Sequence, residues 1–501
     1  MSQMAEASYE STYQPAAEDT GTRPTRPLHE SQVPHWDHEA DVVIVGLGGA
    51  GAAAAIEACE AGANVLILER ASEGGGSTAQ SGGIIYFGGG TPVQQACGFE
   101  DDPAEMLKYL LMASGPNPDA EKCRLYVEQS LEHFAWFEAQ GIEFKRSYYP
   151  KKTTEPVTDD CLLYSGNENV WPFDRTARAA PRGHKPKVEG SAGRVIMETL
   201  IARVKTLGAN IQENARAQTL VVDESGAVMG VYYKQLGEPR YVKASKGVIL
   251  CAGGFIMNRE LVARHVPKLL NVNIQIGNPG DDGAGILMGL GVGAGTLCMG
   301  EGFVSVPFYP PSKLVSGIIV NAQGQRFINE DAYHGRTGEY VLQQSGGVAY
   351  LILDNECFGR PIAGMQIKAA EESIEELERS LELPEGSLTH TVGYYNRAAE
   401  RGEDPLFHKA KNYLKPLVNG PFAALDLSVG KAIIPGFTMG GLDTLPTGEV
   451  LSADKHVIRG LYAAGRTTAG LPRSAAGYSS GMSIGGATFF GRLAGRRAAA
   501  G

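Results

Sequence analysis

Gly46, Gly48 and Gly51 form a glycine-rich turn whose spacing suits the close approach of a backbone to a diphosphate. The turn follows a continuous apolar run, residues 40–45, which is typical of a buried parallel strand, and it opens a run of small residues, 50–61, that predicts a helix. In such a turn Gly46 permits the sharp bend, Gly48 lets the backbone reach the diphosphate, and Gly51 allows helix and strand to pack closely. The free N–H groups and positive dipole end of the helix would bind the negative charge.

Glu69 supplies the acidic group expected beside such a turn. It ends a second apolar run, residues 64–69, and lies 18 residues after Gly51, in the range of the acid that accepts a ribose hydroxyl. A glycine-rich turn without a ligand is the alternative, and the complete order of strand, turn, helix, strand and acid argues against it. The pattern predicts a dinucleotide site but does not by itself separate NAD from FAD.

Three further blocks bear on the choice of cofactor. A loop rich in glycine and hydroxyl groups follows the acid at 70–83, and a strand ending in small residues lies at 246–255. A last strand-like block at 460–466 is followed by the glycine-rich run 477–491. In these blocks and their order the chain resembles the FAD-binding family that includes the fumarate reductase and succinate dehydrogenase flavoproteins and the 3-ketosteroid dehydrogenases.

The resemblance covers residues 40–310 and 425–501 and implies a protein that binds FAD. In that family the second block wraps the flavin, and the last helix directs its N-terminus at the pyrimidine end of the ring, where its dipole favours the reduced, anionic form. The implied FAD contacts are Gly46, Gly48, Gly49, Ala50, Gly51, Glu69, Arg70, Gly76, Ser77, Thr78, Ser81, Gly82, Gly83, Ala252, Gly253, Gly254, Asp282, Gly465, Arg466, Ser483 and Ile484.

The second block, residues 70–83, also indicates how the cofactor is attached. Members of the family with covalent FAD carry a histidine in the second block, where this chain has Gly76 or Ser77. The resemblance therefore implies non-covalent FAD, and no metal site is expected.

The residues near the flavin indicate the class of substrate. The dicarboxylate enzymes of the family hold their substrate with arginines and a histidine, because two carboxylates in a dry site need cationic partners. In this chain Tyr478 stands at the arginine position of the last block, and Val306–Pro310 replaces the His-Pro-Thr motif. These replacements suit a neutral, largely hydrophobic substrate with a carbonyl group.

A tyrosine at this position also resembles the 3-ketosteroid dehydrogenases. The Δ1 members continue Tyr-Pro-Gly-Pro-Gly, whereas Tyr478 is followed here by Ser479 and Ser480, as in the Δ4-(5α) branch. That branch desaturates C4–C5 of 5α-3-ketosteroids. The resemblance implies that Tyr478 binds the C3 keto oxygen and that Ser480 takes the C4 proton, while the hydride leaves C5 for flavin N5. A tyrosine from the cap would assist Ser480; Tyr333 is the candidate and Tyr309 an alternative.

Other interpretations share parts of this pattern. A fumarate reductase-like enoate reductase would need a cationic clamp near the flavin, for which His334 and Arg336 are the available residues. A Δ1-ketosteroid enzyme lacks its Pro-Gly-Pro-Gly run here, and Ser480 could simply cap the terminal helix. A non-catalytic FAD-binding protein is a further alternative, and an NAD-only dehydrogenase would not explain the three further blocks.

The order of the expected strands and helices that position these residues predicts an α/β protein. Strands and helices of Rossmann type occur at both ends of the chain, with helices at 102–141 and 193–207 and a closing helix at 481–499. We therefore expect a discontinuous Rossmann-type FAD-binding domain with an inserted α+β cap or catalytic domain. The expected boundaries are a disordered tail at 1–38, the FAD-binding domain at 39–302 and 426–501, and the cap at 303–425.

Composition restricts the partners and the compartment. A net charge of −11 without a basic stripe argues against nucleic acid and anionic membranes as partners. The seven cysteines show no C-x-x-C spacing, as in a reduced, cytoplasmic protein. The sequence contains no run of about 18 apolar residues, so no transmembrane segment is expected. The electron acceptor, the physiological direction and the steroid side chain stay open.

Overall fold

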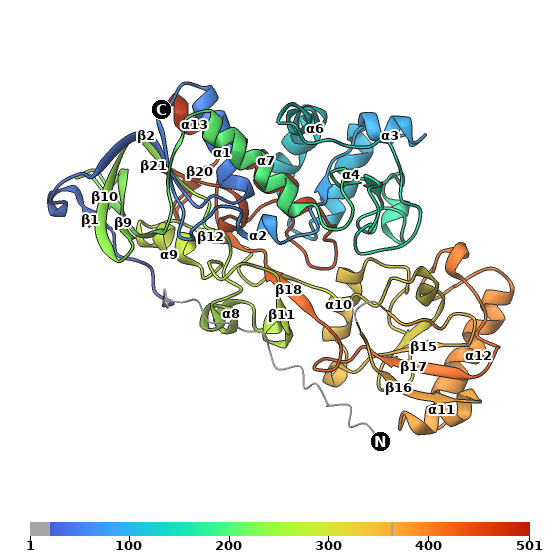
Figure 1. The fold of residues 1–501 in the computed structure, drawn as a ribbon. Helices are drawn as coiled ribbons and strands as arrows, with labels where there is room; N and C mark the ends of the chain where they lie inside the picture. Colours follow the sequence, from blue (N-terminus) through green and yellow to red (C-terminus); the bar gives the residue numbers. More distant parts are fainter. Residues whose placement is uncertain (1–20, 362–363) are drawn as a thin grey trace, which may run out of the picture.

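The computed structural model describes residues 21–361 and 364–501, and Figure 1 shows that they form two lobes. The large lobe comprises residues 28–301 and 439–500, and the small lobe comprises residues 312–426. The chain leaves the large lobe through β13 (Gly302–Val304) and returns through β18 (Pro435–Thr438), and these strands pair antiparallel. The small lobe is therefore an insertion in the large one, which confirms the predicted architecture.

Among the described residues, a nine-stranded mixed sheet forms the centre of the large lobe. Its path runs β1–β8–β9–β10–β2–β3–β7, and β21 and β20 extend it from the end of β10. β2 pairs parallel with both β3 and β10, so that Ile44 stands between Ile67 and Ile249. The strands are β1 Leu28–His29, β2 His38–Val45, β3 Val65–Leu68, β7 Asn210–Gln212, β8 Ala215–Val222, β9 Val228–Gln235, β10 Glu238–Leu250, β20 Glu449–Leu451 and β21 Val457–Ala463.

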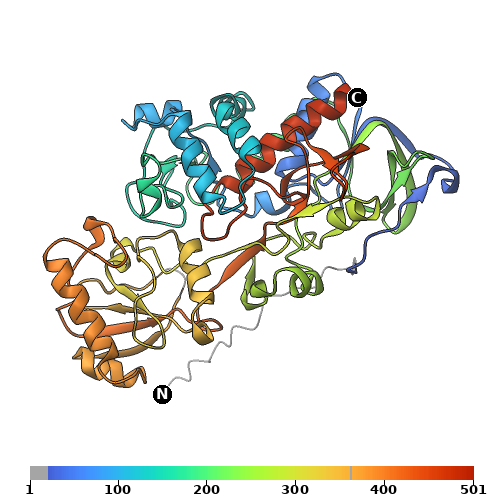
Figure 2. The same cartoon turned by 180° about the vertical axis from the view of Figure 1, so that it is seen from behind.

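Helix α1 (Gly49–Glu60) explains why the N-terminal motif is followed by so many small residues. Residues 49–58 are all buried, and α13 (Met482–Ala500) packs against them. A Cβ at Gly491 of α13 would lie 2.4 Å from the carbonyl oxygen of Ala50, so only glycine permits this approach. Figures 1 and 2 show α1 beside α13, which brings the first and last segments of the chain together at one site.

The remaining helices of the large lobe cover the sheet and the region beside α13. The predicted helices at 102–141 and 193–207 correspond to α4–α6 and α7. The helices are α2 Gly76–Ala79, α3 Pro92–Ala96, α4 Pro103–Ala113, α5 Ala120–Glu128, α6 Ser130–Ala139, α7 Gly193–Thr206, α8 Arg259–His265 and α9 Ala284–Gly291. Short strands accompany them: β4 Ile85–Tyr86, β5 Leu162–Leu163, β6 Gly183–His184, β11 Ile274–Gln275, β12 Thr296–Leu297 and β19 Gly441–Leu442.

The small lobe has an antiparallel sheet in the order β14–β15–β17–β16. Its strands are β14 Ile318–Val320, β15 Tyr350–Leu353, β16 Ile367–Glu371 and β17 Phe422–Asp426. α11 (Ile374–Ser380) packs on β16 and β17, and α12 (Ser387–Glu400) lies beside it at the outer end of the lobe. α10 (His334–Leu342) lies at the side that faces the large lobe, which places the residues before it near the large lobe (Figure 1).

The predicted tail at 1–38 needs correction. Residues 1–20 lie outside the described residues, whereas residues 28 and 29 form β1, which pairs parallel with β8 at Val221 and Val222. Backbone pairing to a sheet edge orders this segment although it lacks a hydrophobic period. The boundaries at 302/303 and 425/426 stay predictions. Within the described part of the chain, no helix has the length and apolar character needed to span a membrane.

Lys185 organises the irregular segment 143–192, in which β5 and β6 are the strands. Its ammonium group is buried and lies within hydrogen-bond distance, 2.6–3.0 Å, of four backbone carbonyl oxygens, those of Pro156, Thr158, Val188 and Gly190, which share its three N–H donors. Carbonyls of an irregular loop have no ladder partners, so a single charged donor can satisfy several of them.

We expect Lys185→Met to destabilise the protein by about 3 kcal/mol, because the carbonyls lose a charged donor in a dry site. Thermal denaturation would show this as a lower Tm. Lys187→Met is the matched control: Lys187 is 49% exposed and pairs with the exposed Glu143, so its loss should change little. Equal Tm values for the two variants would contradict this role for Lys185.

Candidate active site

A cavity of about 1230 Å³ runs through the large lobe to the small lobe. It is lined by the turn after β2, the loop that follows β3, the end of β10, and the N-terminus of α13. Tyr333 and His334 of the small lobe line its other end. The volume exceeds the roughly 300–1,000 Å³ of ordinary ligand pockets, as a site for a dinucleotide and a second molecule requires.

The glycine-rich turn at one end has the geometry that a diphosphate needs. Gly46 has a φ of +100°, which side chains rarely adopt, and a Cβ at Gly51 would lie 1.9 Å from the carbonyl oxygen of Gly46. A Cβ at Gly48 would lie no closer than 3.9 Å to its nearest neighbouring atom, so this face of the turn is open. Gly48, Gly49 and Ala50 line the cavity at the N-terminus of α1, where backbone N–H groups are free to donate.

Glu69 lies beside this turn and is held by the backbone. Its Oε2 accepts from Leu47 N at 2.8 Å and its Oε1 accepts from Ala71 N at 2.9 Å. Burial raises the pKa of Glu69, and these N–H groups oppose that effect. Each oxygen keeps a further lone pair, so the carboxylate can accept ribose hydroxyls.

Asp281 connects three of the four glycine-rich blocks, whereas the predicted FAD contact of the Asp281–Asp282 pair is its neighbour Asp282. Its buried carboxylate accepts from Ser77 Oγ at 2.7 Å and Gly254 N at 3.3 Å, and it pairs with the guanidinium of Arg466. Asp281, Ser77 and Arg466 all line the cavity. One buried carboxylate therefore fixes these three blocks relative to each other.

The structure places most of the predicted FAD contacts on the cavity wall. The lining residues are Gly46, Gly48, Gly49, Ala50, Glu69, Arg70, Gly76, Ser77, Thr78, Ser81, Gly82, Gly83, Ala252, Gly253, Gly465, Arg466, Ser483 and Ile484. Gly51, Gly254 and Asp282 are not among the described lining residues. Asp282 is buried behind the wall, where it pairs with Arg70 at 2.7 Å and accepts from Ala284 N at the start of α9.

These residues fit FAD. The wall offers backbone donors at the N-terminus of α1 for a diphosphate, a carboxylate for ribose, and small residues where a flat ring must pass. The N-terminus of α13 also lines the cavity, through Gly481, Ser483 and Ile484. A helix N-terminus there would stabilise negative charge on a reduced flavin.

The other end of the cavity brings the three predicted catalytic residues together. Tyr333 OH and Ser480 Oγ share a hydrogen bond of 2.7 Å, and Tyr478 OH donates to Ser483 Oγ at 3.1 Å. Burial raises the pKa of both tyrosines, so both are neutral phenols near neutral pH. All three residues line the cavity.

Apolar rings surround these hydroxyl groups. The Phe303 ring lies 4.7 Å from that of Tyr478 and 4.9 Å from that of Phe437, and both phenylalanines line the cavity. No sequence motif marks these two phenylalanines. Their apolar character is a signal shared by all core residues, so only the fold reveals that they face the site.

Tyr309, the alternative to Tyr333, bonds the backbone beside Tyr333. Its hydroxyl accepts from His334 N at 3.0 Å and it is not among the described lining residues, so it supports the turn that carries Tyr333. His334 lines the cavity, but burial lowers its pKa to about 3, and its Nδ1 is bonded to Ser305 Oγ at 2.6 Å. His334 is therefore neutral and cannot serve as a cationic clamp.

Arg336 does not supply a clamp either. It stacks on the rings of Phe173 and Tyr340 and is not among the described residues that line the cavity. Neither of the two cationic candidates that the sequence offered therefore supplies a clamp, and the hydroxyl groups of Tyr478 and Ser480 suit the neutral carbonyl compound that the sequence predicts.

A buried ionic group anchors the segment that carries Tyr333. Arg326 bonds Glu330 at 2.8 Å and Asp404 at 2.9 Å, and Lys409 Nζ lies 3.3 Å from Glu330. Although burial acts to raise the pKa of Glu330, the two cations hold it below its usual range. The chain between Arg326 and Tyr333 is therefore fixed to the core of the small lobe.

Known proteins resemble this chain over nearly its whole length. A family model described as FAD binding domain matches residues 41–482. The structure of 3-ketosteroid-Δ4-(5α)-dehydrogenase from Rhodococcus jostii RHA1, in complex with 4-androstene-3,17-dione, is 42% identical and covers 95% of this chain and 99% of that chain, with a TM-score of 0.90.

Two curated relatives represent the steroid dehydrogenases and the fumarate reductases of the family. The 3-oxo-5-alpha-steroid 4-dehydrogenase of Comamonas testosteroni is 30% identical over 86% of this chain and 93% of its own length. A fumarate reductase (cytochrome) of Shewanella frigidimarina is 27% identical over 92% of this chain and 77% of its own length.

Removal of the charge at Asp281 should weaken cofactor binding. We expect Asp281→Asn to raise the Kd for FAD about 10- to 100-fold, because it weakens a charged hydrogen bond worth roughly 1.5–3 kcal/mol. Titration of the apoprotein with FAD, followed by flavin fluorescence, measures this change. Asp223→Asn is the control, since Asp223 lies in the exposed turn between β8 and β9. Unchanged FAD affinity of Asp281→Asn would contradict this account.

Proposed function

Because this chain belongs to the FAD-binding domain family, we propose that it is an FAD-dependent 3-ketosteroid dehydrogenase that forms the C4–C5 double bond of 5α-3-ketosteroids. The observation that carries the proposal is the hydrogen bond between Tyr333 and Ser480, with Tyr478 and its neighbouring phenylalanine rings at the same end of the cavity. The similarity to two Δ4-(5α) enzymes over most of the chain supports it.

Tyr478 is the proposed donor to the C3 keto oxygen. As a buried neutral phenol it can redirect the hydrogen that it now donates to Ser483 toward a substrate carbonyl. Removal of a proton beside the ketone develops enolate charge on that oxygen, and a preorganised donor in a dry site stabilises this charge. When bound, FAD supplies the two-electron acceptor for the hydride that leaves C5.

Ser480 and Tyr333 are proposed to move the C4 proton. A serine hydroxyl is a weak base by itself, so it needs a partner that accepts the serine hydroxyl proton. Tyr333 is within hydrogen-bond distance for that step. Ser480 Oγ would accept the C4 proton while its hydroxyl proton passes to the Tyr333 oxygen, and Tyr333 would pass its own phenolic proton on toward solvent.

The wall of the cavity supports non-covalent attachment of FAD. His334 is the one histidine among the described lining residues, and its Nδ1 is engaged with Ser305. Cys251 also lines the cavity, but burial raises its pKa to about 12, so it is a poor nucleophile. At the second block the wall presents Gly76 and Ser77.

The proposed substrate is a hydrophobic ketosteroid, and the proposed compartment is the cytoplasm. All seven cysteines are free, as expected where thiols stay reduced. The apolar rings around Tyr478 match a fused-ring substrate with one polar end.

Removal of either hydroxyl group should abolish most turnover without loss of flavin. We expect Tyr478→Phe to lower the rate of flavin reduction by a 5α-3-ketosteroid about 10²- to 10³-fold, and Ser480→Ala about 10²- to 10⁴-fold. Anaerobic stopped-flow mixing measures both rates. Both proteins should stay yellow, because neither residue is proposed to hold FAD, and acid precipitation should release the flavin, because its attachment is proposed to be non-covalent.

Tyr340→Phe is the matched control for the first substitution. It removes a tyrosine hydroxyl that bonds Arg336 in the small lobe and is not among the described lining residues. Its rate should stay near that of the unaltered protein. Near-normal rates in Tyr478→Phe or Ser480→Ala would refute the role of that residue.

A further inference from the structure

The loop at residues 165–167 lies between two parts of the active site that are distant in sequence. The carbonyl oxygen of Ser165 accepts from Ser480 N at 2.8 Å. Two residues later, Asn167 Oδ1 accepts from Tyr333 N at 2.9 Å. One short loop of the large lobe therefore bonds the backbones of both members of the Tyr333–Ser480 pair.

Tyr109 of α4 completes this connection. Its hydroxyl accepts from Asn167 N at 3.0 Å and shares a hydrogen bond of 2.7 Å with Ser479 Oγ. Gly166 is required at this point, since a Cβ there would lie 1.9 Å from Ser479 Oγ and 2.8 Å from Tyr109 OH. The loop, the helix and the flavin-facing run are thus in direct contact.

These bonds are shielded from water. Tyr109, Asn167 and Ser479 are each 0% exposed. Loss of one partner would leave the other buried and unsatisfied, at a cost of roughly 1–3 kcal/mol. The contacts are therefore rigid constraints on the positions of Ser480 and Tyr333.

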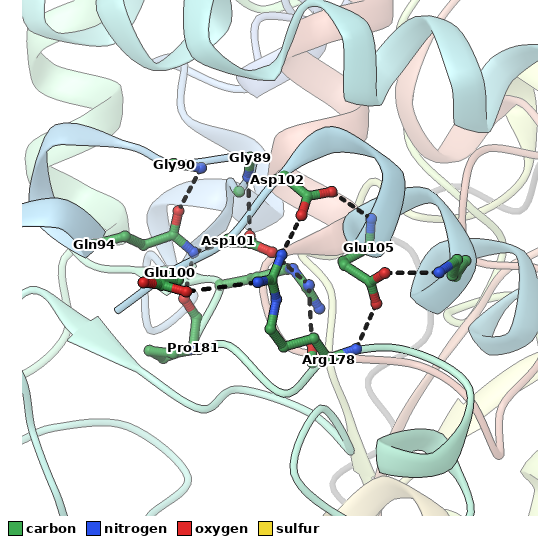
Figure 3. A network of polar contacts seen from close by, with 12 residues as sticks. Gly89, Gly90, Gln94, Glu100, Asp101, Asp102, Glu105, Arg178 and Pro181 are labelled. Atoms are coloured by element: carbon green, nitrogen blue, oxygen red, sulfur yellow. Dashed lines mark hydrogen bonds and ion pairs between the residues drawn. The ribbon is translucent and has the colours of Figure 1, made fainter. Parts of the chain in front are cut away.

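A separate polar network fixes α4 itself. Asp102 caps the helix through Glu105 N at 2.9 Å and pairs with Arg178, and Glu105 accepts from Arg178 N, as Figure 3 shows. The neighbouring Asp101 carries a fully buried ion pair with Arg182 at 2.7 Å. Tyr109 therefore projects from a helix whose start is held in place.

We propose that Asn167 and Tyr109 are positioning residues that hold Tyr333 against Ser480. This inference rests on the proposed function. Neither residue is among the described residues that line the cavity, so both act through the pair that does. The pair joins two lobes, and proton transfer needs the oxygens at about 2.6–3.2 Å. A misplacement of about 1 Å can lower a rate about 10²-fold.

The test compares Asn167→Ala with Asn167→Asp in the FAD-loaded protein. Anaerobic mixing with 5α-androstane-3,17-dione measures flavin reduction, and titration with 4-androstene-3,17-dione measures steroid affinity. We expect the steroid to reduce the flavin of Asn167→Ala about 10²-fold more slowly than that of the unaltered protein. The Kd for the steroid should stay unchanged, because Tyr478 keeps its place. Asn167→Asp retains an acceptor for Tyr333 N and should recover part of the rate, and Tyr109→Phe should resemble Asn167→Ala.

Hydrogen exchange gives a readout that does not depend on turnover. The Tyr333 amide should exchange faster in Asn167→Ala than in the unaltered protein, because its acceptor is gone. The matched control is Asn329→Ala. Asn329 is also buried in the small lobe and bonds the large lobe at the carbonyl oxygen of Trp171, but no described hydrogen bond joins its side chain to Tyr333 or Ser480. Its reduction rate should stay near normal.

The outcomes distinguish the positioning role of Asn167 from the proposed steroid dehydrogenase function. A normal reduction rate in Asn167→Ala, or a rate loss matched by an equal loss of steroid affinity, would overturn the positioning role while the proposed function stands. If the unaltered protein itself fails to reduce flavin with this steroid, the proposed function fails. The exchange rate of the Tyr333 amide then decides separately whether Asn167 holds this segment.

Discussion

The hydrogen bond between Tyr333 and Ser480 is the constraint on which the account depends. The two residues are 147 positions apart and belong to different lobes, so neither lobe alone can set their distance. The buried ionic group around Arg326 and Glu330 fixes Tyr333 to the small lobe, and the N-terminus of α13 fixes Ser480 to the large lobe. The strand pair β13–β18 and the loop at 165–167 connect these two supports. A weak base such as serine becomes useful only if its proton acceptor is held in place.

The cofactor site follows the same principle of distant segments fixed by a few buried contacts. The close packing of α1 against α13 brings the first glycine-rich block beside the last one. Asp281 then joins the second, third and fourth blocks through Ser77, Gly254 and Arg466. Because these contacts are buried, they fix the shape of the wall that would hold FAD.

Local sequence patterns predict the strand, turn and helix at the start of the FAD-binding domain, and the family resemblance predicts the catalytic residues. The strand at 40–45, the glycine-rich turn and the helix after it follow from residue order alone, and β2 and α1 confirm them. Tyr478, Ser480 and Tyr333 came from the resemblance, and the structure brings them together. The bridging contacts of Asp281 and the contacts of Asn167 could not be predicted, because their partners lie in segments distant in sequence and in loops without a hydrophobic period. The predicted tail was too long, since β1 is ordered by backbone pairing, which leaves no pattern in the side chains.

The most direct test of the central claim is a single anaerobic turnover. FAD-loaded protein is mixed with 5α-androstane-3,17-dione, oxidised-flavin absorbance is followed, and the steroid product is identified by NMR. We predict prompt bleaching and a stoichiometric yield of 4-androstene-3,17-dione, with the new double bond between C4 and C5. Flavin that stays oxidised, or a product unsaturated at C1–C2, would contradict this claim.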